Sequence, residues 1–175
     1  FFDSLSPIKH KIGGYFLQLN EQFGPKNADV VIKYLEELPE REQVFLEFRH
    51  PDFFKESTEN ELFYQRIQDL KVGLLITDTA GRRDCAHMRL TTPKAFIRFV
   101  GNSLHPTDYM RMDDWVQRLQ YWLNNGLESM YFFMHQHDEL YSPEAVVYLI
   151  DQLNKECGLK LKPLKLVGGE QVSLF

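Results

Sequence analysis

The chain has 175 residues, of which 43% are hydrophobic and 26% are charged, as in an ordinary globular protein with a sizeable core. Its net charge of −5 argues against an extended basic surface for nucleic acid. No apolar stretch approaches the roughly 20 residues of a membrane helix and no signal peptide is visible, so we expect no membrane partner. Cys85 and Cys157 lack metal-site spacing, and we expect reduced thiols in a cytoplasmic protein.

Apolar runs and amphipathic stretches alternate along the chain. The runs typical of buried strands are 14–20, 44–50, 72–79, 94–102 and 129–137. Helical spacing of apolar residues is found at 26–39, 59–70, 112–125 and from Ser142 onward, where Ser142 is predicted to cap the last helix. The segment 80–94 is predicted to be a long polar loop. Because no linker interrupts this order, we expect a single domain over 1–175, with a tail at 158–175.

The alternation of strands and helices predicts an α/β fold with a parallel sheet. About five strand–helix units fit an open doubly wound sheet or five eighths of a TIM (β/α)8 barrel. Polar side chains near the ends of the predicted strands distinguish these two alternatives. They are Gln18, Glu47, Arg49, Asp78, Arg98 and His135. An open sheet would bury these groups under helices on both faces, whereas a barrel places them at its ligand-binding mouth, so the pattern favours the barrel.

Several segments resemble a known family. They are YFLQLNEQFGP (15–25), LEFRHPDFF (46–54), LLITDT (74–79), FIRFVG (96–101) and SLF (173–175). Together they are similar to the YecE-like family of bacterial and archaeal TIM-barrel proteins, which has no established activity. The resemblance implies that this chain matches the C-terminal two thirds of the family, with barrel strands four to eight present and the N-terminal part absent.

Two positions depart from the family pattern. Asn20 stands where the family often has proline, and His135 stands where it often has asparagine. A chemistry based on His135 would therefore not be a property of the family.

The predicted mouth offers candidate catalytic groups. Glu47 and Asp78 would act as general acid and base if their environments separated their pKa values. His50, which is held extended before Pro51, would transfer protons at the rim. The alternatives are that His50 caps the following loop and that Glu47 belongs to an internal ion network with Arg49 and Arg98. A hydrolase- or lyase-type enzyme is one interpretation, and the cofactor is undetermined.

Other side chains at the mouth suggest ligand binding. Arg49 and Arg98 would hold a phosphate or carboxylate group, and Gln18 and His135 would orient a small anionic substrate. The basic loop at 80–94 would close over such an anion or remain a flexible charged loop.

A metal site and a partner site are weaker hypotheses. His135 and His137 fall on one face of a strand and are candidate metal ligands, although the remaining ligands would have to come from elsewhere. The last five residues, QVSLF (171–175), resemble the peptide that binds the bacterial sliding clamp, with Gln171, Leu174 and Phe175 as its anchors. That likeness suggests, as an alternative function, a protein linked to DNA replication or repair.

Overall fold

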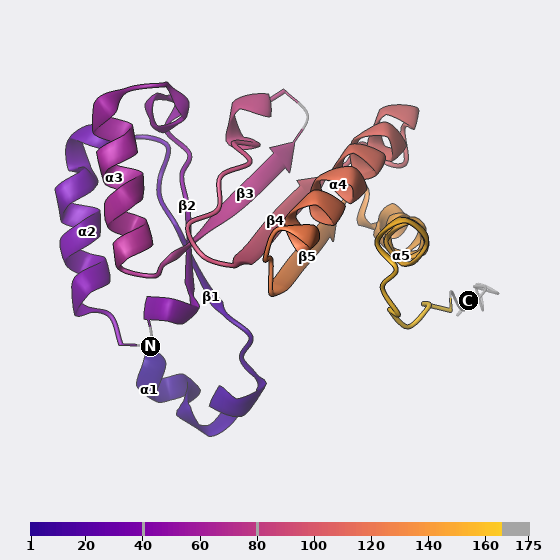
Figure 1. Cartoon of the computed structure of the whole chain (residues 1–175), viewed down its shortest axis with the longest axis horizontal. Helices are drawn as coiled ribbons and strands as arrows, with labels where there is room; N and C mark the ends of the chain where they lie inside the picture. The colour runs from indigo at the N-terminus through magenta and orange to yellow at the C-terminus, as the bar shows by residue number, and fades with distance from the viewer. Residues whose placement is uncertain (40, 80, 166–175) are drawn as a thin grey trace, which may run out of the picture. The chain divides into compact units, whose positions relative to one another are not determined.

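The computed structural model describes residues 1–39, 41–79 and 81–165 (Figure 1). Its strands are β1 (Tyr15–Gln18), β2 (Val44–Glu47), β3 (Gly73–Thr79), β4 (Lys94–Val100) and β5 (Ser129–His135). Its α-helices are α1 (Phe2–Leu5), α2 (Ala28–Glu37), α3 (Thr58–Asp69), α4 (Pro106–Asn124) and α5 (Ser142–Cys157). The described residues form two compact units, one within residues 1–100 and 126–133 and the other within residues 101–125 and 134–165.

The prediction of a parallel five-stranded sheet is confirmed. The strands lie in the order β1-β2-β3-β4-β5, so each strand is hydrogen-bonded to the next one along the chain. The pairs β1–β2, β2–β3 and β3–β4 are parallel, and their registers place Gln18 beside Glu47, Leu46 beside Leu74, and Thr77 beside Arg98. A doubly wound sheet reverses its strand order part-way. The order seen here has no reversal, which excludes that alternative for these strands.

Helices α2 and α3 cover one face of the sheet in the first unit. The strands contribute Val44, Leu46 and Leu74 to the resulting core, and Phe48 joins them from just beyond β2. The helices contribute Val31, Ile32, Leu35, Phe63, Tyr64 and Ile67. The helical residues recur every three or four positions, which brings them onto one side of each helix. Figure 1 shows the two helices side by side along the first strands.

The connection from β2 to α3 is fixed by side chains. The hydroxyl of Ser57 accepts a hydrogen bond from the Asn60 backbone N–H at 3.1 Å, which caps α3. The buried Asn60 amide donates to the carbonyl oxygens of Asp52 at 2.7 Å and of Lys55 at 2.8 Å. Asn60 therefore donates hydrogen bonds to two backbone carbonyl groups of a loop that is not part of the sheet.

The second unit contains α4 and α5. Helix α4 begins at Pro106, six residues before the predicted start, because the His105 ring accepts from the Thr107 N–H at 3.3 Å and Pro106 occupies the first turn. The Tyr148 hydroxyl of α5 donates to the Asp113 carboxylate of α4 at 2.7 Å. Burial and this contact raise the pKa of Tyr148 to about 12.

Two further expectations concern chain organisation. Ser142 is the first residue of α5 and makes no side-chain cap; its hydroxyl donates instead to Glu139, so the prediction of a Ser142 cap was wrong. The expectation of a single domain stays a prediction, since a division into compact units does not decide whether each folds alone. Within the described ranges, no helix is both long enough and apolar enough to cross a bilayer.

Candidate functional site

A row of polar side chains crosses the C-terminal ends of β1 to β4, on the sheet face opposite α2 and α3. Its members, called the polar row below, are Gln18, Glu47, Arg49, Thr77 and Arg98. The Thr77 hydroxyl donates to Glu47 Oε1 at 2.9 Å, and Arg98 Nη1 lies 3.5 Å from both Glu47 Oε2 and Gln18 Oε1. Arg49 Nη2 lies 2.8 Å from Glu47 Oε1. The structure thus brings together four of the sequence-predicted residues, and it adds Thr77.

Positive charges outnumber negative charges in the polar row. Glu47 is 1% exposed, and its single carboxylate faces two guanidinium groups, whose side chains are 26% exposed in Arg49 and 31% exposed in Arg98. Its five members therefore sum to one positive charge. Among the described residues, the buried Nε of Arg49 has no hydrogen-bond acceptor. Because buried donors are normally paired, the cluster has donor capacity to spare.

Asp78 does not join the polar row, so the predicted pairing of Glu47 with Asp78 was wrong. Leu46 is in register with Leu74, and side chains alternate between faces along a strand. Asp78 therefore shares the helix-covered face of Leu74, while Thr77 shares the face of Glu47. The Asp78 carboxylate is buried and pairs with Arg83. Two carboxylates on opposite faces of a sheet cannot act across one pocket.

His50 caps the loop that follows it, which is the alternative to a proton-transfer role. Its Nδ1 accepts a hydrogen bond from the Asp52 N–H at 3.2 Å, and its backbone is extended before Pro51 as predicted. It lines a hollow of about 600 Å³ together with Gly24, Lys26 and Ser57. A proton-transfer role for His50 stays a prediction.

The two remaining histidines of the sequence analysis fall in the second unit. His135 Nδ1 lies 3.1 Å from Glu139 Oε1, an ion pair when the ring is protonated. In the part of the chain that the structure describes, no three histidine, cysteine or acidic residues gather as a metal site would require. His135 and His137 thus have no described set of further ligands, and the role of His135 in orienting a ligand stays a prediction.

The basic loop after β3 has its cations paired. The pairs are Arg82 with Asp84, Arg83 with Asp78, and Arg89 with Glu61. Arg82 also donates to the backbone oxygen of Arg49 at 2.9 Å, which ties the loop to the end of β2. These contacts bind the loop to the first unit, and its closure over an anion stays a prediction.

Aromatic rings lie on the same sheet face as the polar row, one layer toward the N-terminal ends of the strands. This aromatic layer comprises Phe16, Phe45, Phe96, Tyr131 and Phe133. The ring centroids of Phe45 and Phe96 are 5.1 Å apart, and Phe96 stacks on Phe133 at 4.9 Å. Phe45 and Phe96 are buried, whereas Phe16 is 55% exposed and Phe133 is 49% exposed.

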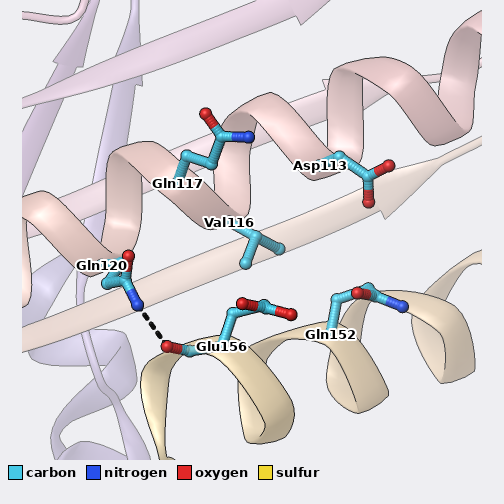
Figure 2. A pocket seen from close by; sticks show the side chains of 6 residues that line it. All are labelled: Asp113, Val116, Gln117, Gln120, Gln152 and Glu156. Atoms are coloured by element: carbon cyan, nitrogen blue, oxygen red, sulfur yellow. Dashed lines mark hydrogen bonds between the residues drawn. The ribbon is translucent and has the colours of Figure 1, made fainter.

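A second hollow lies between α4 and α5, with a volume of about 300 Å³ (Figure 2). Its lining residues are Asp113, Val116, Gln117, Gln120, Gln152 and Glu156. The Gln120 amide donates to the backbone oxygen of Glu156, which joins the two helices at one end of the hollow. The lining carries amide and carboxylate groups but no cation, so this hollow does not suit an anion.

Comparison with known proteins identifies the family. The model of the family "Protein of unknown function DUF72" matches residues 1–166. The chain belongs to the DUF72 family. The UPF0759 protein YecE of Escherichia coli (strain K12) is 29% identical over 173 residues, covering 89% of this chain and 63% of YecE. The chain therefore spans less than two thirds of the length of that curated relative, and the predicted YecE-like resemblance is confirmed.

Solved DUF72 structures share the fold. A DUF72 family protein from Enterococcus faecalis superposes with a TM-score of 0.66 at 15% identity, covering 95% of this chain and 68% of that one. One from Thermotoga maritima superposes with a TM-score of 0.57 at 19% identity, covering 89% of this chain and 62% of that one. The DUF72 family has no assigned function, so the chemistry of this member must be argued from its own side chains. The clamp-like peptide at 171–175 lies outside the described residues.

Proposed function

We propose that the five strands are part of a TIM barrel whose interior is the face bearing the polar row, and that this row binds a small anion. The unreversed strand order supports the barrel, because successive parallel strands wound in one direction leave their helices on the outside. Ligands of such barrels bind at the C-terminal ends of the strands. The polar row lies at those ends.

The charge imbalance of the polar row carries the proposal. Among the described residues, one buried carboxylate serves two partly exposed guanidinium groups, so the second positive charge is available to a bound anion. Guanidinium groups bind carboxylate and phosphate through paired N–H donors, and here both remain partly exposed. Arg49 and Arg98 are therefore assigned to the anion. Gln18, which is exposed beside Arg98, would orient it.

Glu47 is better suited to be the counter-ion of the two arginines than to be a general acid or base. Its two oxygens are already engaged by Arg49, Thr77 and Arg98, which sets the directions of both guanidinium groups. Asp78, the partner carboxylate expected from the sequence, lies on the opposite face of the sheet. The proposed function is therefore binding of a small anion. A catalytic step would require side chains other than Glu47.

Titration of the chain with inorganic phosphate tests the proposal. We expect saturable binding by calorimetry, and Arg98→Gln should weaken it by about tenfold or more, as expected for the loss of a charged hydrogen bond. Arg66→Gln is the matched control, because Arg66 is an exposed arginine that pairs with Asp29 away from the polar row. Equal phosphate affinity in all three proteins would refute the proposal, as would no binding at all.

A further inference from the structure

The backbone of Arg49 is held by a side chain from another part of the chain. Strand β2 ends at Glu47 and residues 48–50 belong to no strand, so the ladder of hydrogen bonds that fixes β2 stops short of Arg49. The backbone oxygen of Arg49 instead accepts a hydrogen bond from Nη2 of Arg82 at 2.9 Å. Because a binding side chain is only as well placed as the backbone that carries it, this contact bears on the anion site.

Arg82 is itself fixed at both its backbone and its side chain. Its N–H donates to the Thr79 oxygen at 3.3 Å, which ties it to the end of β3. Its guanidinium group meets the Asp84 carboxylate along one edge, with Nε 3.0 Å from Oδ1 and Nη2 3.1 Å from Oδ2. These hydrogen bonds lower the pKa of Asp84, and a two-point contact of this kind sets the plane of the guanidinium group. Arg82 thus links the end of β3 to the chain just beyond β2 in a defined direction.

We infer that Arg82 is a positioning residue of the anion site, which fixes Arg49 through its backbone and does not itself bind the anion. This inference rests on the proposed function. The charge of Arg82 is balanced by Asp84. Glu47 sets the direction of the Arg49 guanidinium group, and Arg82 sets the position of the Arg49 backbone. The two contacts order Arg49 before the anion arrives, which lowers the entropic cost of binding.

Phosphate titration of Arg82→Gln and Arg89→Gln tests the inference. The two arginines lie in the same loop and each replacement removes one positive charge, but Arg89 pairs with Glu61 of α3, at 2.8 Å, rather than with the chain beyond β2. We expect Arg82→Gln to weaken phosphate binding about threefold to tenfold, the cost of ordering one side chain on binding, and Arg89→Gln to leave it unchanged. Equal weakening by both replacements would overturn the inference.

Asp84→Ala separates position from charge by the sign of its effect. If Arg82 acted by its charge or as a direct ligand, removal of its carboxylate partner would strengthen phosphate binding. If Arg82 acts by its position, loss of Asp84 releases the guanidinium group and phosphate binding weakens. Arg82→Gln combined with Asp84→Ala should then bind phosphate as tightly as Arg82→Gln alone. Tighter binding in Asp84→Ala overturns the inference.

Arg49→Gln supplies a background in which a positioning role disappears. Because Arg82 is inferred to act through Arg49, Arg82→Gln should cause no further loss of phosphate affinity in this background. Its effect on the free energy of unfolding should persist, since the backbone oxygen at position 49 is still present. A further loss of affinity overturns the inference. If Arg49→Gln binds phosphate too weakly to measure, the sign of the Asp84→Ala change decides.

These outcomes are distinguishable from failure of the proposed function. If Arg98→Gln weakens phosphate binding and Arg82→Gln does not, the anion site stands and the positioning role of Arg82 is wrong. If the wild-type chain binds no phosphate, both proposals fail.

Discussion

The clearest pH dependence expected of the first unit arises at His87. Its ring stacks on Phe54 at 5.9 Å, its Nδ1 accepts from the Arg89 N–H at 3.2 Å, and its Nε2 lies 3.4 Å from the Leu75 oxygen. A neutral ring with its proton on Nε2 satisfies both contacts. Burial, helped by the charge of Arg89 and opposed by the Leu75 carbonyl, lowers the pKa of His87 to about 4.

The sign of the effect follows from the unfolded chain, in which a histidine has a pKa of about 6.5. Between pH 6.5 and pH 4 the unfolded chain binds a proton that the folded chain does not, so stability falls as the pH falls. From pH 7.5 to pH 5 this difference amounts to about 2 kcal/mol. The ring is only partly buried, so we expect a loss of about 1–2 kcal/mol.

Urea denaturation followed by circular dichroism at both pH values measures this loss. His87→Gln removes the titration, so its free energy of unfolding should fall by about 1–2 kcal/mol less than that of the wild type over the same interval. His10→Gln, which changes an exposed histidine, should behave like the wild type. If His87→Gln and the wild type lose the same stability, the assignment of a neutral, partly buried His87 is refuted.

The remaining predictions concern side chains of the first unit, each measured by urea denaturation. Glu47→Gln should lower the free energy of unfolding by about 1–3 kcal/mol, because two partly exposed guanidinium groups lose their partner, yet it should retain phosphate binding; loss of binding without loss of stability would instead assign Glu47 to the ligand. Asn60→Ala should cost about 1–3 kcal/mol, because the Lys55 carbonyl loses the amide donor and the Asp52 carbonyl keeps only the Lys55 N–H at 3.4 Å, while exposed Gln65→Ala should cost under about 0.5, and equal losses would contradict that account. Ile67→Ala should cost about 2–5 kcal/mol by opening a cavity in a fully buried site, and a loss as small as that of exposed Leu62→Ala would argue against the core described above.

Strand identity was predictable because each strand is a short apolar run bounded by polar or turn residues. All five predicted runs contain the observed strands. Their ends were less predictable: the run 44–50 was expected to be strand throughout, but β2 ends at Glu47. Residues 48–50 belong to no strand, although His50 has an extended backbone before Pro51. Apolar character alone does not distinguish such unpaired backbone from a paired strand.

The assignment of faces shows where sequence reasoning stops. In β2 one face is wholly apolar, so alternation placed Glu47 and Arg49 correctly opposite the helices. In β3, Leu74 and Ile76 on one face are as apolar as Leu75 on the other, so alternation alone could not say which face Asp78 joins. The pairing of Leu46 with Leu74 decides it. That register, which the sequence does not reveal, places Thr77 rather than Asp78 beside Glu47.

The start of α4 was missed for a local reason. Apolar spacing becomes regular only near Met112, whereas the first turn is held by a capping histidine and a proline. Such caps act through hydrogen bonds to backbone N–H groups and add no apolar periodicity. His105-Pro106 was the available signal.

The consecutive order of the strands also bears on how the chain can fold. The first paired residues of neighbouring strands, Tyr15 with Val44, Phe45 with Gly73 and Leu75 with Phe96, are 29, 28 and 21 positions apart. Each closure therefore spans a loop of similar, modest length and carries a similar entropic cost. No strand from β2 to β4 needs to wait for a later segment before it can pair with the strand before it. During synthesis on the ribosome, the sheet can grow by adding one strand at a time as each emerges.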